Sequence, residues 1–106
     1  MSVPPQQMLE ELRKAEHSRD LMSELERRLS AGNTDLENLL RQLEQLRQSL
    51  PQSDPKRLLI EDALGAARTR DTVKAGSDVS RSRSALEGEI SSLQGAIQGV
   101  QARPDL

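Results

Sequence analysis

The stretch that decides the fold is residues 22–50, MSELERRLSAGNTDLENLLRQLEQLRQSL. Along it, apolar residues recur at spacings that alternate between three and four, and Gly32 takes the one position that is not a large apolar residue. This is the heptad pattern of a helix that buries one narrow stripe. We call the apolar members the leucine seam: Met22, Leu25, Leu29, Leu36, Leu39, Leu43, Leu46 and Leu50.

Residues 31–35, Ala-Gly-Asn-Thr-Asp, are the weak point of this pattern. Gly32 and Asn33 are typical of a helix stop, and Thr34 with Glu37 fits a capping box that begins a new helix. The heptad phase nevertheless continues through the segment without a slip. We therefore expect one heptad helix over residues 8–50 with a soft break at 31–35, and a turn at that position remains the alternative.

The remaining boundaries follow from proline, glycine and changes of phase. Pro51 and Pro55 mark a joint at 51–55, where Asp54 can cap the next helix. We then expect a weakly amphipathic helix over 56–75, a joint at Gly76-Ser77, and a second heptad helix over 76–102. Residues 1–7 form a flexible lead-in and 103–106 a tail. The second stripe consists of Val79, Arg83, Leu86, Ile90, Leu93, Ile97 and Val100.

The composition lacks the side chains that most chemical sites need. There is no Cys, Phe, Trp or Tyr, and the one His is His17. We therefore expect no enzyme, no metal and no cofactor. The 15 basic and 17 acidic residues are mixed along the chain, which disfavours nucleic-acid binding. No apolar run approaches the ~18 residues of a membrane span, and the N-terminus has no signal-peptide pattern, so we predict a cytoplasmic location and no membrane.

Three local patterns have a chemical and a structural interpretation. The acidic pairs Glu10-Glu11 and Glu61-Asp62 are interpreted as solvated helix faces, because neighbours on a helix point about 100° apart. The hydroxyls of residues 77–84 lie beside two arginines and could be kinase targets, but a capping box from Ser84 to Glu87 is the simpler role. Gly95 and Gly99 thin the last helix, which would let a partner approach closely.

The segment 36–47, LENLLRQLEQLR, followed by the joint LPQSDP at 50–55, resembles rod segments of plakin-type cytoskeletal linkers. The resemblance covers residues 8–102. It implies a dimerising, load-bearing role at the cytoskeleton and no catalysis.

Two architectures of the all-α class are consistent with these patterns, and a chain that folds only on binding is a third possibility. In the first, long amphipathic helices form a coiled coil with a second copy or a related chain, giving a homo- or heterodimer. Its interface is the leucine seam together with Val79, Leu86, Ile90, Leu93, Ile97 and Val100, and Arg83 helps to set the register. In the second, turns near Gly32, Pro51–Pro55 and Gly76 give a self-contained antiparallel helical bundle that acts as an adaptor for a partner helix.

Overall fold

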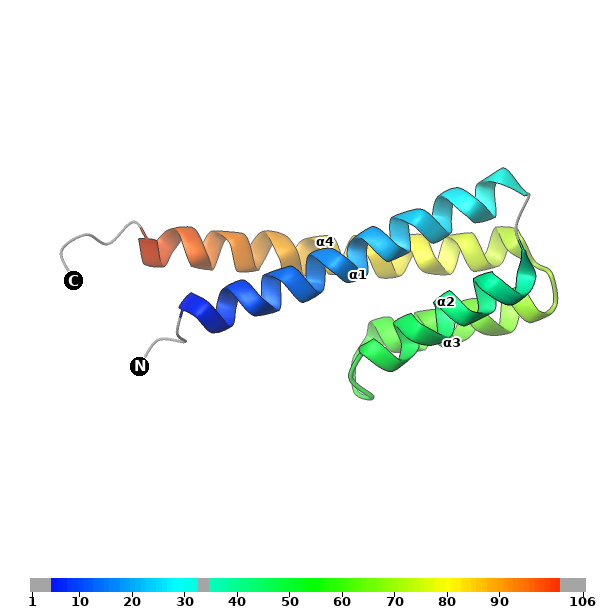
Figure 1. Ribbon diagram of the computed structural model, residues 1–106, viewed down its shortest axis with the longest axis horizontal. Coiled ribbons are helices and arrows are strands. Elements are labelled where there is room, and N and C mark those ends of the chain that lie inside the picture. The colour runs from blue at the N-terminus through cyan, green and yellow to red at the C-terminus, as the bar shows by residue number, and fades with distance from the viewer. Residues whose placement is uncertain (1–4, 33–34, 102–106) are drawn as a thin grey trace.

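The computed structural model describes residues 5–32 and 35–101, and the regular structure of this part of the chain is entirely helical, which confirms the all-α prediction. The four helices are α1 (Pro5–Ala31), α2 (Leu36–Ser49), α3 (Pro55–Arg68) and α4 (Thr72–Gln101). Figure 1 shows that successive helices run in opposite directions. The helices of one chain therefore pack on each other as an antiparallel bundle, the second of the two architectures.

The bundle has one long and one short pair of helices. α1 and α4 have 27 and 30 residues, which corresponds to about 40 and 45 Å of helix. α2 and α3 have 14 residues each, or about 21 Å. α1 and α4 lie side by side over most of their length, and the α2–α3 hairpin packs on one half of that pair (Figure 1). The molecule is consequently elongated, with extents of 56 × 26 × 18 Å.

The soft break at 31–35 is a true joint, so the expectation of one continuous helix over 8–50 is wrong. α1 ends at Ala31, and Gly32 has a φ of +68°, a left-handed conformation that favours glycine. The Asp35 side chain then accepts a hydrogen bond from the Glu37 N–H and caps α2. The cap is Asp35, whereas Thr34 lies outside the described residues. At its other end, α1 begins at Pro5, inside the predicted lead-in.

The proline joint is found where the sequence predicts it. α2 ends at Ser49, and the Leu50 N–H donates to the Arg47 carbonyl oxygen. Asp54 accepts a hydrogen bond from the Lys56 N–H at 2.9 Å and caps α3, with Pro55 at the first helical position. Fixed φ and a missing N–H make proline suitable for this position, and the joint needs no unusual backbone.

The third joint lies at Thr69–Asp71, several residues before the predicted joint at Gly76-Ser77. The Arg70 and Asp71 N–H groups donate to the carbonyl oxygens of Ala67 and Ala66, which is the paired hydrogen bonding of a Schellman motif. Arg70 takes the left-handed position with a φ of +63°. α3 therefore ends at Arg68 rather than 75, and Gly76 lies inside α4, where a Cβ would stand 3.9 Å from the Leu29 Cβ.

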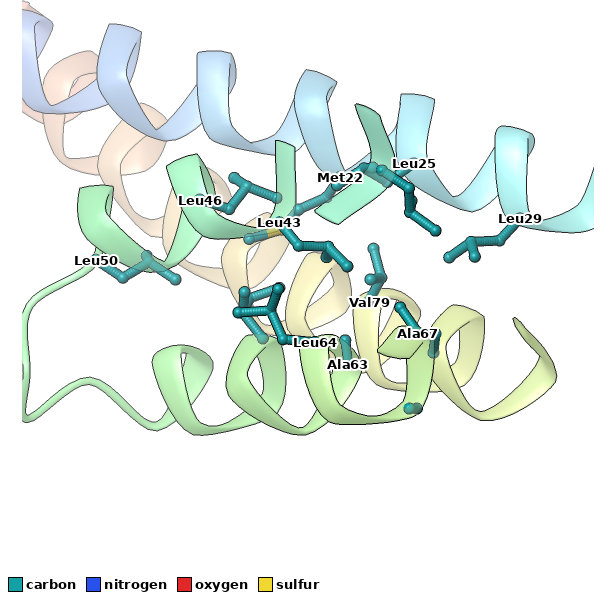
Figure 2. Packing of buried hydrophobic residues seen from close by; sticks show 14 of the residues in the cluster. Met22, Leu25, Leu29, Leu43, Leu46, Leu50, Ala63, Leu64, Ala67 and Val79 are labelled. Carbon is teal, nitrogen blue, oxygen red and sulfur yellow. The ribbon is translucent and has the colours of Figure 1, made fainter. Parts of the chain in front are cut away.

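The core is formed by aliphatic side chains from all four helices. Figure 2 shows side chains of the leucine seam pointing from α1 and α2 toward α3 and α4. Alanines on the facing helices keep the layer thin, which suits a chain with no aromatic residue. The buried cluster contains Met22, Leu25, Leu29, Leu39, Leu43, Leu46, Leu50, Ile60, Ala63, Leu64, Ala66, Ala67, Ala75, Val79, Leu86 and Ile90.

Candidate interaction surface

Most of the residues predicted to meet a second chain are buried within this one chain. The seam residues other than Leu36 are at most 7% exposed, and Leu36 packs at the edge of the cluster. On α4, Val79, Leu86, Ile90 and Ile97 are buried and Leu93 is half-buried, while the side chain of Val100 lies outside what the structure describes. A coiled coil between two chains along the leucine seam would therefore require this core to open first.

Arg83 links α4 to α1 through side-chain hydrogen bonds. Its guanidinium lies on the side of α4 that faces α1, where it donates a hydrogen bond to Glu26, and it also bonds Glu87 one turn further along α4. The bond to Glu26, reinforced by Glu87, raises the pKa of Arg83 above its usual value. These contacts join two helices of one chain, so the role predicted for Arg83 in the register of two chains stays a prediction.

Lys56 ties the beginning of α3 to the middle of α4. Its side chain is 5% exposed, and its Nζ lies 2.8 Å from Asp54 Oδ2 and 2.6 Å from Glu89 Oε1. Burial lowers the pKa of this ammonium, but the hydrogen bonds to the two carboxylates outweigh burial and the pKa is raised. Lys56 therefore stays charged and marks the point at which the α2–α3 hairpin stops covering the long pair.

Beyond this point the long pair continues alone as a two-helix projection, which we call the arm and define as residues 5–18 of α1 and 90–101 of α4 (Figure 1). The two segments are about 21 and 18 Å long. Of the apolar side chains between these two helices, Ile90 and Ile97 are buried, whereas Met8, Leu12, Ala15 and Leu93 are only half-buried. The arm thus keeps a partly exposed apolar edge that the α2–α3 hairpin does not cover.

A shallow groove lies between α1 and α4 next to the Lys56 anchor, where the arm joins the rest of the bundle. Glu11 and Ala15 of α1 line it on one side, and Ala85, Ser92 and Leu93 of α4 line it on the other. Gly88 and Glu89 complete the floor near the hairpin. A Cβ added at Gly88 would meet nothing within 4 Å, so this surface of α4 is open. The groove continues the line along which α3 packs on α4.

Charge is distributed unevenly over the arm. From Ile90 to Gln101, α4 carries no charged residue, although 30% of the chain is charged. The facing part of α1 carries both signs, and its Glu11 and Lys14 are exposed. Neither of these two makes a hydrogen bond or ion pair with any described residue. The arm therefore combines an uncharged stretch of α4 with a stretch of α1 that carries exposed charges of both signs.

The other candidate residues lie apart from each other and do not form a chemical site. Glu10 and His17 are exposed on α1, whereas Glu61 lies near two arginines, with its Oε2 3.6 Å from Arg47 Nη1 and 3.9 Å from Arg57 Nε. The predicted cap at Ser84 is wrong, because Ser84 lies in the interior of α4.

Ser82, in the same hydroxyl-rich segment, is fully buried, and its hydroxyl lies 3.6 Å from the Met22 sulfur. A kinase could not reach it in the folded chain. Sequence reasoning missed Lys56 because nothing in its local pattern distinguishes it from a solvated lysine.

Searches for other kinds of site give two further results. Within residues 5–32 and 35–101, no three His, Cys, Asp or Glu side chains gather as metal ligands would, and no helix combines the length and apolar character needed to cross a bilayer. Comparison with protein-family models, curated proteins and solved structures finds no match to this chain.

Proposed function

We propose that this chain is a non-catalytic helical interaction module that holds another helical surface against its arm. The observation that carries the proposal is the mismatch in helix length, which leaves about half of the α1–α4 pair without the α2–α3 hairpin that covers the rest. Helices that their own chain covers on one side only can complete their apolar packing when a partner helix binds, as in helix-in-groove recognition.

The groove chemistry supports a helical partner over a small molecule. The groove is shallow and open, and Leu93 is the one large apolar residue among the small residues that line it. Small-molecule sites are usually concave and enclose most of the ligand. A helix that places one apolar ridge between Ala15 and Leu93 would suit this shape better.

A diazirine-bearing side chain placed at Ser92 tests the proposal in cells that naturally express the chain. Ser92 lines the groove, whereas Gln45 is an exposed residue of α2 that serves as the matched control. We expect one discrete protein adduct from position 92 that is absent from position 45 and is lost when Leu93→Glu is added. Equal labelling from both positions would show that the arm is not a binding surface.

The plakin-type rod interpretation makes a different prediction. It requires an elongated dimer joined along the leucine seam, and a cytoskeletal and cytoplasmic location. Both remain predictions. Hydrodynamic measurement of the purified chain distinguishes an elongated dimer joined along the leucine seam from a bundle that binds through its arm.

A further inference from the structure

The open half of the molecule has the dimensions of the arm itself. A partner that covers all of it is one helix layer thick, two helices wide and about 18–21 Å long, so that it ends where the α2–α3 hairpin begins. The arm of a second copy has these dimensions. Two copies related by a two-fold axis can interlock, so that each arm lies on the other's arm and ends against the other's turn at 51–53.

Helical phase identifies the face of α1 that such a partner would meet. Arg28 of α1 reaches toward α2, with its Nη1 3.0 Å from Asn38 Oδ1 and 3.1 Å from Gln42 Oε1. Lys14 lies two heptads before Arg28, so its direction differs from that of Arg28 by only about 40°. Glu11, two heptads before the buried Leu25, adjoins Lys14 on this face.

The face of α4 that takes part in this surface is found in the same way. Glu89 points to α3, where it meets Lys56, and Ala96 lies one heptad further on. Apart from Glu89, whose charge is paired with Lys56, the α4 side of the surface is uncharged, and most of its residues are small.

We propose that the arm of one chain packs antiparallel on the arm of a second copy, with Glu11 of each chain paired with Lys14 of the other. This inference rests on the proposed function and names the partner. A two-fold axis makes such contacts reciprocal, since residue 11 meets residue 14 twice. The two unpaired charges of opposite sign, three residues apart on one face, are the arrangement that a self-complementary contact requires.

The area of the contact sets the strength of the dimer. A face about 20 Å long and two helices wide gives on the order of 400–600 Å² per copy. Specific stable interfaces bury about 800 Å² per partner. We therefore expect a weak dimer whose population rises with protein concentration and falls with added salt.

Sedimentation equilibrium of the full chain between about 5 μM and 1 mM tests the proposal, with interference optics because the chain has no aromatic residue. We expect the mass to rise from 11.8 kDa toward twice that value. Glu11→Lys or Lys14→Glu alone should raise the dissociation constant about tenfold or more, because each places like charges opposite each other. An equimolar mixture of the two variants should dimerise as well as the unchanged chain, because both pairs are again of opposite sign.

The matched controls are Asp62→Lys on α3 and Arg41→Glu on α2, two exposed positions outside the arm. They should leave the dissociation constant unchanged, and circular dichroism confirms that every variant is folded. A mass of 11.8 kDa up to 1 mM, or a mixture that stays monomeric, overturns the dimer. If the Ser92 adduct then contains a different protein, the interaction module stands without its self-partner. If the arm labels nothing, both proposals fail.

Discussion

Gly32→Ala separates a turn from a continuous helix by the sign of its effect on stability. A Cβ at position 32 would meet nothing within 4 Å, so the substitution acts on the backbone alone. At a φ of +68° an alanine is strained by about 1–2 kcal/mol. Part of this is offset, by about 0.4–1 kcal/mol, because alanine also restricts the unfolded chain.

We therefore expect Gly32→Ala to lower the free energy of unfolding by roughly 0.5–1 kcal/mol. Thermal unfolding followed by circular dichroism should show the melting temperature fall by about 3–6 °C. If residues 31–35 were helical, the same substitution would stabilise the chain by about 1 kcal/mol, since alanine replaces glycine in a helix interior.

Gly65→Ala provides the matched control. Gly65 lies inside α3, is exposed, and also has open space where its Cβ would stand. It should gain about 0.5–1 kcal/mol from the higher helix propensity of alanine. If both variants gained stability to a similar extent, the turn at Gly32 and the separation of α1 from α2 would be refuted.

Three further outcomes follow from the described contacts. Leu43→Ala should cost about 2–5 kcal/mol of unfolding free energy in urea titrations, because the side chain is completely buried, whereas Leu58→Ala, at a 63% exposed position, should change stability by less than about 0.5 kcal/mol. Lys56→Met should lower the free energy of unfolding by about 1–2 kcal/mol, which is less than for a deeply buried pair because Glu89 can turn to solvent. Addition of Glu89→Gln should then lower it little further. A second decrease of the same size would show that the two groups act independently. The hydrogen bond from Arg27 lowers the pKa of Glu24. The contribution of the Glu24 carboxylate to the free energy of unfolding is therefore present above the unfolded pKa of 4.5 and is lost as the pH falls through the lower folded pKa. A melting temperature that rose from pH 5 to pH 3 would contradict this sign.

The buried face of each helix could be predicted from the sequence because burial of one stripe imposes a period near 3.5. The same pattern could not reveal the turn at Gly32. The joint happens to preserve the heptad phase, so α1 and α2 read as one helix even though they run in opposite directions. Gly32 and the capping pattern that follows it were the informative signal, although the cap itself is Asp35.

The third joint was misplaced for a different reason. It contains neither glycine nor proline, and Arg70 accepts a left-handed backbone that sequence rules assign to glycine. Gly76, in contrast, lies within α4 beside Leu29. Because the joint comes earlier than expected, α3 is short and α4 long, and the difference in length that creates the arm could not be foreseen from the sequence.

A period also does not state which helix will cover a stripe. The leucine seam is equally suited to a second chain and to helices of its own chain, and loop geometry makes the choice here. The unpaired Glu11 and Lys14 appear in the sequence as ordinary surface charges. Their shared direction becomes informative only when α2 is placed two heptads further along the same face.

The shared phase of α1 and α2 has a consequence for how the fold could be exchanged between molecules. If residues 31–35 became helical, residues 5–49 would form a single helix with all its leucines still on one stripe. Two such opened chains could trade α1 and rebuild the same core in a domain-swapped pair, with no change in which side chains touch. A single left-handed glycine therefore helps to keep each chain closed on itself.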